Sequence, residues 1–213
     1  MRILLATALL LVPVTAAAQA ADEGVFIIRK GGEEIGREEF SIRPDSPRPG
    51  RTTIVARSQY VGAWAPLQLT ATLELDSASH LISFRLSHDS GAGPSRYSAD
   101  AGHRVLIIHQ VSRGSERARE MPGGPKILTI DEGVYALLAA LTVRATEQGE
   151  QVPLIYPRTG ERGTVTVRRE NSGSGVVVRL SGDLLGSIRL DDRGRMVGME
   201  FPAGGIEILR LRP

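Results

Sequence analysis

Apolar and polar side chains alternate with a period of two in a series of short segments that begins at residue 24. In the clearest segment the apolar positions are Leu67, Leu69, Ala71, Leu73 and Leu75. Successive side chains of an extended strand point to opposite faces, so this spacing places all five on one face. A polar turn at 76–79 follows, and the alternation resumes at 80–87. The two segments are predicted to form a β-hairpin.

The same alternation recurs along most of the chain, and turn residues separate nearly all of the segments. Glycine, proline, asparagine and aspartate dominate these short connections, which are typical of antiparallel neighbours. The sequence therefore predicts an antiparallel meander. Its further strands are predicted at 24–29, 33–43, 51–62, 95–100, 103–112, 115–120, 151–156, 161–169, 175–181, 185–191, 195–201 and 205–211.

One segment departs from the strand pattern and predicts a helix of about three turns over 132–142. Asp131 is suited to cap its N-terminus, and Ile130 and Tyr135 are spaced for a hydrophobic staple. From Val134 to Leu141 the only polar side-chain group is the tyrosine hydroxyl. A helix that is apolar around its whole circumference must be covered on nearly all sides.

These elements predict a mainly β fold in which a curved antiparallel sheet surrounds one central apolar helix. About a dozen strands exceed what a twisted open sheet usually holds before it curves or splits. We therefore expect a half-open or flattened β-barrel. A β-sandwich with a peripheral helix is the alternative, because both architectures give the same strand alternation.

The N-terminal segment 1–20 has the pattern of a secretory signal peptide. Arg2 precedes an apolar run of about a dozen residues, which is too short to span the ~30 Å hydrocarbon core of a membrane. The small residues Ala18 and Ala20, on either side of Gln19, predict cleavage after Ala20, which leaves a single domain at 21–213 in the periplasm. A retained membrane anchor is the alternative. The chain has no cysteine, which excludes a lipobox, disulfides and thiolate metal sites.

Composition indicates a folded protein and offers no strongly charged surface. Hydrophobic residues make up 41% of the 213 residues and charged residues 23%, which is unlike a disordered chain. There are 26 lysines and arginines against 24 acidic residues, and the basic residues are scattered among acids. This distribution argues against a nucleic-acid partner. No segment after the signal peptide is predicted to be transmembrane.

The order of these features resembles a family of exported bacterial domains of unknown function. It comprises a signal peptide, strand hairpins, one apolar helix that begins at an aspartate, residues 151–154 (QVPL) and final hairpins with residues 190–197 (LDDRGRMV). In architecture the family resembles the Lol-type lipoprotein carriers. The resemblance implies a curved antiparallel sheet that embraces helices and an apolar cavity, and it brings no catalytic residues.

The spacing of the histidines and acidic residues argues against a metal site or a catalytic site. His80 and His88 lie about 26 Å apart on an extended strand, so they cannot share a metal ion; pairing across strands with His103 and His109 would be needed. No Gly-x-Ser-x-Gly motif suggests a nucleophile. The adjacent acids at 33–34, 38–39 and 191–192 point to opposite faces of a strand and are predicted to be solvated. We expect no catalytic residues, no metal, no cofactor and no enzymatic activity.

Two functions remain open. In the first, the protein is a periplasmic, non-enzymatic binding or carrier module for an apolar, lipid-like ligand held on the concave side of the sheet. Trp64 at a rim, and Tyr135, Leu138 and Ala139 on the helix, are the candidate ligand-binding residues. In the second, the helix fills the concavity, and the protein is a structural or accessory component that docks onto an envelope protein through a sheet edge.

Overall fold

The computed structural model describes residues 22–45, 48, 50–65, 67–91, 93–124, 126–173 and 175–211. The signal peptide predicted at 1–20, with its cleavage site, lies outside the described residues.

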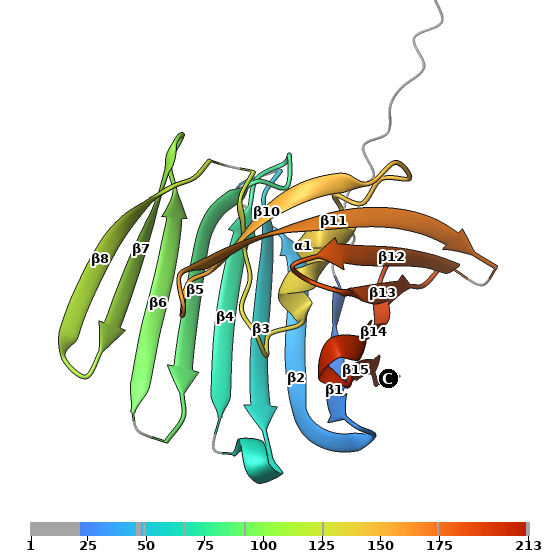
Figure 1. Ribbon diagram of the computed structural model, residues 1–213, viewed down its shortest axis with the longest axis horizontal. Helices are drawn as coiled ribbons and strands as arrows, with labels where there is room; N and C mark the ends of the chain where they lie inside the picture. The colour runs from blue at the N-terminus through green and yellow to red at the C-terminus, as the bar shows by residue number, and fades with distance from the viewer. Residues whose placement is uncertain are drawn as a thin grey trace, which may run out of the picture.

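All the described strands belong to one sheet (Figure 1). Every predicted strand is present, and no end differs from the prediction by more than three residues. The strands are β1 (Asp22–Lys30), β2 (Glu33–Pro44), β3 (Thr52–Tyr60), β4 (Gln68–Leu75), β5 (Leu81–Asp89), β6 (Pro94–Ala101), β7 (Val105–Ser112), β8 (Ser115–Pro122), β9 (Leu128–Thr129), β10 (Glu150–Tyr156), β11 (Glu161–Ser172), β12 (Gly175–Gly182), β13 (Gly186–Leu190), β14 (Met196–Phe201) and β15 (Ile206–Arg210).

The first and last strands are neighbours in the middle of the sheet. The strand order is β8-β7-β6-β5-β4-β3-β2-β1-β15-β14-β13-β12-β11-β10-β9. Pairing of β1 with β15, with Ile28 opposite Ile208, joins an arm formed by β1–β8 to an arm formed by β9–β15. The edges β8 and β9 are not hydrogen-bonded to each other, so the sheet is curved but not closed. This confirms the half-open curved sheet and excludes two separate sandwich sheets within the described residues.

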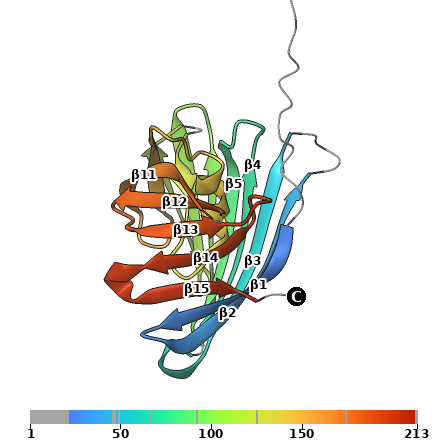
Figure 2. The same ribbon diagram turned by 90° about the vertical axis from the view of Figure 1, so that its right-hand side faces the viewer.

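The second arm folds back over the first (Figures 1 and 2). Strands β10 and β11 cross in front of β3–β5, and the helical segment lies between the two arms. Alternating apolar side chains fill the space. Phe26 stacks on Phe40 with ring centroids 4.4 Å apart, and Leu73 and Phe84 are completely buried.

Strand β9 was not predicted, and it is the exception to the meander. It has two residues and pairs parallel to β10, with Leu128 opposite Leu154. Two residues are too few to produce a visible alternation.

The predicted helix at 132–142 is wrong in its extent. Only 136–142 is helical, as a 3₁₀ turn η2 (Ala136–Leu138) followed by α1 (Ala139–Thr142). Gly133 has a φ of +88°, which is incompatible with a right-handed helix at that point. Asp131 therefore caps nothing, and the predicted staple from Ile130 to Tyr135 does not arise.

The burial of the helical segment is confirmed. All seven residues from Ala136 to Thr142 are buried. Just beyond it the buried Arg144 donates hydrogen bonds to the carbonyl oxygens of Ser79 and Lys126, at 2.7 Å each. No helix in the described part of the chain has the length and apolar character that crossing a membrane requires.

Candidate functional site

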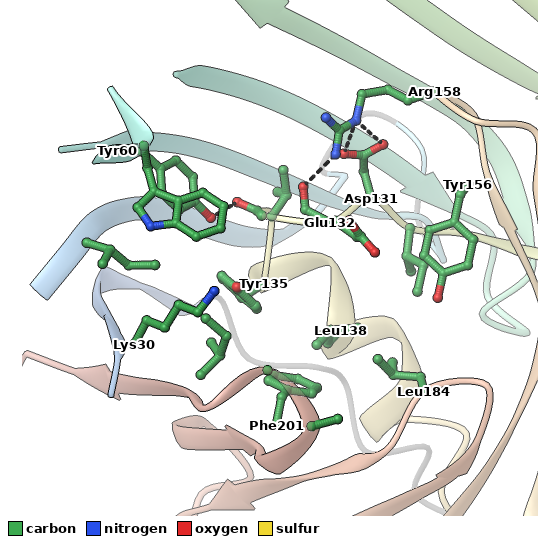
Figure 3. Close-up of a pocket in the computed structure, with 18 of the residues that line it drawn as sticks. Lys30, Tyr60, Asp131, Glu132, Tyr135, Leu138, Tyr156, Arg158, Leu184 and Phe201 are labelled. Carbon is green, nitrogen blue, oxygen red and sulfur yellow. Dashed lines mark hydrogen bonds and ion pairs between the residues drawn. The ribbon is translucent and has the colours of Figure 1, made fainter. Parts of the chain in front are cut away.

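A cavity of about 540 Å³ lies between the two arms, beside the helical segment (Figure 3). Its walls come from segments far apart in the sequence, which include the β1–β2 hairpin, the end of β3, the 3₁₀ turn η1 (Gly62–Trp64), residues 130–138, the end of β10, the loop 183–185 and the 3₁₀ turn η3 (Pro202–Gly204). Most lining side chains are apolar or aromatic. They include Ile35, Tyr60, Trp64, Leu67, Ile130, Val134, Tyr135, Leu138, Tyr156, Leu184, Leu185, Phe201 and Ile206.

Two tyrosines form part of the wall. The Tyr60 hydroxyl donates a hydrogen bond of 2.9 Å to the carbonyl oxygen of Gly133, and the Tyr135 ring lies 5.9 Å from that of Phe201. Burial raises the pKa of Tyr135 to about 12 and also raises the pKa of Tyr60. Both phenols are therefore neutral at physiological pH. A Cβ at Gly133 would collide with Tyr60 and Leu69, which is a second reason for glycine there.

Glu38 holds the segment that carries Tyr135. Its side chain comes from β2, is completely buried, and accepts hydrogen bonds from Ser58 Oγ (2.7 Å), Tyr135 N (2.9 Å) and Ala136 N (2.6 Å). It thus supplies, from the sheet, the N-terminal cap that Asp131 does not provide. Burial raises the pKa of Glu38 to about 7, against the lowering effect of these hydrogen bonds.

The prediction that Glu38 is solvated is therefore wrong. Gly36, Glu38, Phe40 and Ile42 are all buried, while Glu39 is exposed. The period-two alternation of this strand contained the signal, because it places Glu38 on the same face as Phe40 and Ile42.

A second buried carboxylate lies at the cavity wall, paired with an arginine. Arg158 Nε lies 2.8 Å from Asp131 Oδ1 and 3.0 Å from Oδ2, and Arg158 Nη2 donates to the carbonyl oxygen of Glu132 at 3.0 Å (Figure 3). The Asp131 side chain is 1% exposed and that of Arg158 is 25% exposed. Burial raises the pKa of Asp131 to about 6, although the Arg158 guanidinium acts in the opposite direction.

Trp64 and Lys30 lie together at the cavity mouth. Lys30 Nζ is 4.7 Å from the centroid of the indole ring, within the range of a cation–π contact. Trp64 is 43% exposed, so it is a rim residue and not core cover. Its large apolar surface is available to whatever enters the cavity.

The structure brings three of the four predicted ligand-binding residues to the cavity wall. Trp64, Tyr135 and Leu138 line it; Ala139 does not, and is packed in the core at 2% exposure. Because the helical segment begins only at Ala136, the residues that face the cavity differ from those of a continuous helix from 132. Sequence reasoning did not find the rest of the wall, which comes from segments far apart in the chain: Lys30, Arg158, Leu184, Leu185 and Phe201.

The histidines do not converge. In the sheet His88 is opposite Leu69 and Ser95, whereas His109 is opposite Ser98 and Ala118. Within the described ranges, no group of three or more His, Cys, Asp or Glu residues is arranged to hold a metal ion.

Comparison of the sequence with protein families finds no match, and comparison with curated proteins finds none either. Solved structures do resemble the chain. One is a β-barrel-like protein of domain of unknown function DUF1849 from Brucella abortus, with a TM-score of 0.53 and 12% identity over 88% of this chain and 93% of that one. The fold is β-barrel-like.

A protein of the DUF1089 family from Pseudomonas aeruginosa has a TM-score of 0.49 and 13% identity, over 78% of this chain and 90% of that one. The likeness to the Brucella abortus protein agrees with the expected exported-domain architecture in its curved, barrel-like sheet alone. The resemblance to Lol-type carriers stays a prediction.

Proposed function

We propose that the protein is an exported, non-enzymatic binding or carrier module that holds an apolar, lipid-like ligand in the cavity between its two arms. The observation that carries the proposal is the cavity itself. Its volume of about 540 Å³ is within the range of small-molecule sites, and its wall is mainly apolar and aromatic.

The polar groups around the cavity support binding over catalysis. Asp131 is engaged by Arg158, and Glu38 is fully hydrogen-bonded beneath the wall. Both carboxylates hold backbone or neighbouring side chains in place, which leaves the apolar surfaces of Leu138, Phe201 and Leu184 to contact a ligand. Burial of hydrocarbon against such surfaces yields about 25 cal/mol per Å².

Export remains part of the proposal and rests on the N-terminal segment 1–20. In the periplasm a carrier would shield an apolar chain from water between two membranes. N-terminal sequencing of the protein recovered from cells is expected to give a chain that begins at Ala21; a chain that retains Met1 in the membrane fraction would contradict this part.

The second candidate is an accessory role in which a partner pairs with the edge strand β8. Among the described strands, only β7 pairs with β8, so the other edge of β8 has no partner there. However, β8 carries Glu116, Arg117, Arg119 and Glu120, and charged side chains of this kind oppose pairing with another strand. The cavity also differs from the filled concavity that this role assumed, so the observations favour the binding role.

Lipid extraction tests the proposal directly. Protein purified from its native envelope without detergent would be extracted with organic solvent, and the extract analysed by mass spectrometry. We expect one class of amphiphile in near-stoichiometric amount. A Leu184→Trp variant, which fills the cavity, serves as the matched control and is expected to retain much less. Equal recovery from the two proteins, or none from either, would contradict the proposal.

A further inference from the structure

Three arginines, two on β8 and one in the turn after β10, line one groove beside the cavity. The groove has a volume of about 300 Å³ and is lined by Ile108, Gln110, Arg117, Ala118, Arg119, Pro157, Arg158 and Thr159. Arg158 lines both the groove and the apolar cavity. The groove is therefore next to the proposed ligand site, with one side chain common to both.

The register of the sheet brings two of these arginines to the same face. Arg117 is opposite Gln110 and Arg119 is opposite Ile108 in the β7–β8 pair. Residues directly opposite in an antiparallel pair project to the same face, and Ile108 is buried on the inner one. Arg117 and Arg119 thus face inward from the edge strand, toward the connection from β10 to β11.

The groove lies where the edge strand β8 approaches the turn between β10 and β11. The Arg119 guanidinium packs so closely on Gly160, in the turn between β10 and β11, that a Cβ at that glycine would collide with it. Beside it, Arg162 Nη2 donates a hydrogen bond to the carbonyl oxygen of Pro122, at the end of β8. These side-chain contacts join β8 to the region where β10 turns into β11, two parts of the sheet that are not neighbouring strands.

The groove has an excess of positive charge. None of its lining residues is acidic, and among the described residues neither Arg117 nor Arg119 forms an ion pair. The acids of β8 face the other way, since Glu116 lies 3.7 Å from His109 on the outer face. Arg158 is paired with Asp131, so the unpaired charges of the groove are those of Arg117 and Arg119. Glu161, two residues after Thr159, accepts a hydrogen bond from Thr159 Oγ1 at 3.2 Å.

We infer that this groove binds the anionic headgroup of the amphiphile whose apolar chain occupies the cavity, and that the headgroup is of the phosphate type. The inference rests on the proposed function and adds the class of ligand to it. Guanidinium groups bind phosphate through paired, charge-assisted hydrogen bonds, and several of them around one groove suit a group with three exposed oxygens. Gln110 adds an uncharged donor on the same face.

The test compares two probes that share an oleoyl chain. Oleoyl lysophosphatidic acid carries a phosphate, whereas 1-monooleoyl glycerol is uncharged. Each is titrated below its critical micelle concentration into the full mature chain, the Arg117→Gln/Arg119→Gln double variant, and a control with the same loss of charge. The control is Arg57→Gln/Arg85→Gln, at exposed positions on β3 and β5 outside the groove.

We expect the wild type and the control to bind the phosphate probe roughly tenfold more tightly than the uncharged one. The groove variant is expected to lose this preference and to bind the uncharged probe as the wild type does. The preference should also shrink at high ionic strength, because Arg117 and Arg119 are exposed.

Each other outcome has a defined meaning. Equal binding of the two probes by the wild type, or an unchanged preference in the groove variant, overturns the inference and leaves the apolar cavity standing. Binding of neither probe overturns the inference together with the proposed function. Inorganic phosphate that binds as tightly as the phosphate probe, and is lost in the groove variant, assigns the groove to free phosphate and overturns the headgroup inference.

Discussion

The carboxylate of Glu38 on β2 accepts a 2.6 Å hydrogen bond from the backbone N–H of Ala136, a residue 98 positions later in the chain. With the bond from Tyr135 N, it fixes the start of the helical segment against the inner face of the sheet. Tyr135 and Leu138 line the cavity, so this buried acid positions part of the wall from below. The local geometry of the site thus depends on a residue that never contacts the cavity.

Glu38→Ala is expected to lower the free energy of unfolding by about 2–4 kcal/mol, because two buried backbone N–H groups lose their acceptor. Glu39→Ala is the matched control: Glu39 is exposed, and its removal should change stability by less than about 0.5 kcal/mol. Urea unfolding of both variants measures the difference. Equal stabilities would show that Glu38 does not hold the segment.

The pKa of Glu38 predicts a dependence of stability on pH. An acid whose pKa is raised in the folded state contributes stability below its unfolded pKa, near 4.5, and loses that contribution as the pH rises through about 7. The loss attributable to Glu38 is about 3 kcal/mol across this interval. Asp131, with a pKa of about 6, titrates in the same interval, so the informative quantity is the difference between the wild type and Glu38→Gln at each pH. A difference that is constant with pH would contradict the prediction.

Removal of Arg158 should leave the Asp131 carboxylate buried without its partner. We expect Arg158→Ala to cost about 3–5 kcal/mol near pH 8. Loss of Arg158 raises the pKa of Asp131 above its wild-type value of about 6, so the cost should shrink as the pH falls from 8 toward 6 and Asp131 becomes protonated in the variant. The double variant Asp131→Asn/Arg158→Ala should recover much of the loss, as a double-mutant cycle at high and low pH would show. Additive losses in that cycle would mean that the pair is not coupled.

The Ala139→Phe variant tests whether Ala139 belongs to the core or to the cavity wall. Ala139 is buried but does not line the cavity, so the larger ring should cost about 1–3 kcal/mol of overpacking strain. Affinity of the folded variant for an apolar probe should stay within about twofold of the wild type. Thermal unfolding and probe titration on the same sample measure both. Weakened binding with unchanged stability would place Ala139 in the cavity wall after all.

The sheet could be predicted because each strand buries one face, which imposes the period-two alternation on the sequence. Leu69, Ala71 and Leu73 are all buried, as their spacing indicates. Strand β9 could not be predicted, since Leu128 and Thr129 take their conformation from β10 and not from a pattern of their own. The helical segment was overestimated because Asp131 and Glu132 favour a helix start locally, whereas Gly133 and the pair with Arg158 determine the backbone there.

The site was predictable only in part, because most of its wall is assembled by the tertiary fold and not by a local sequence pattern. Trp64 and Tyr135 stand out in the sequence as large aromatic residues near the expected rim and helix. Leu184, Phe201 and Arg158 reach the cavity because the second arm folds over the first. No local sequence pattern identifies them as residues that line a cavity. In the same way, Arg117 and Arg119 look like scattered surface charges in the sequence. The register of β7 and β8 turns both side chains inward, where they line one groove with Arg158.

Titration of the wild type with N-phenyl-1-naphthylamine, an uncharged apolar fluorophore, tests the central claim that the cavity binds an apolar ligand. Leu184→Trp fills the cavity, and Val111→Trp adds the same ring at a position 40% exposed on β7, outside it. We expect saturable binding to the wild type, equal affinity in Val111→Trp, and roughly tenfold weaker binding in Leu184→Trp. Absence of saturable binding to the wild type, or equal affinity in all three proteins, would contradict the account.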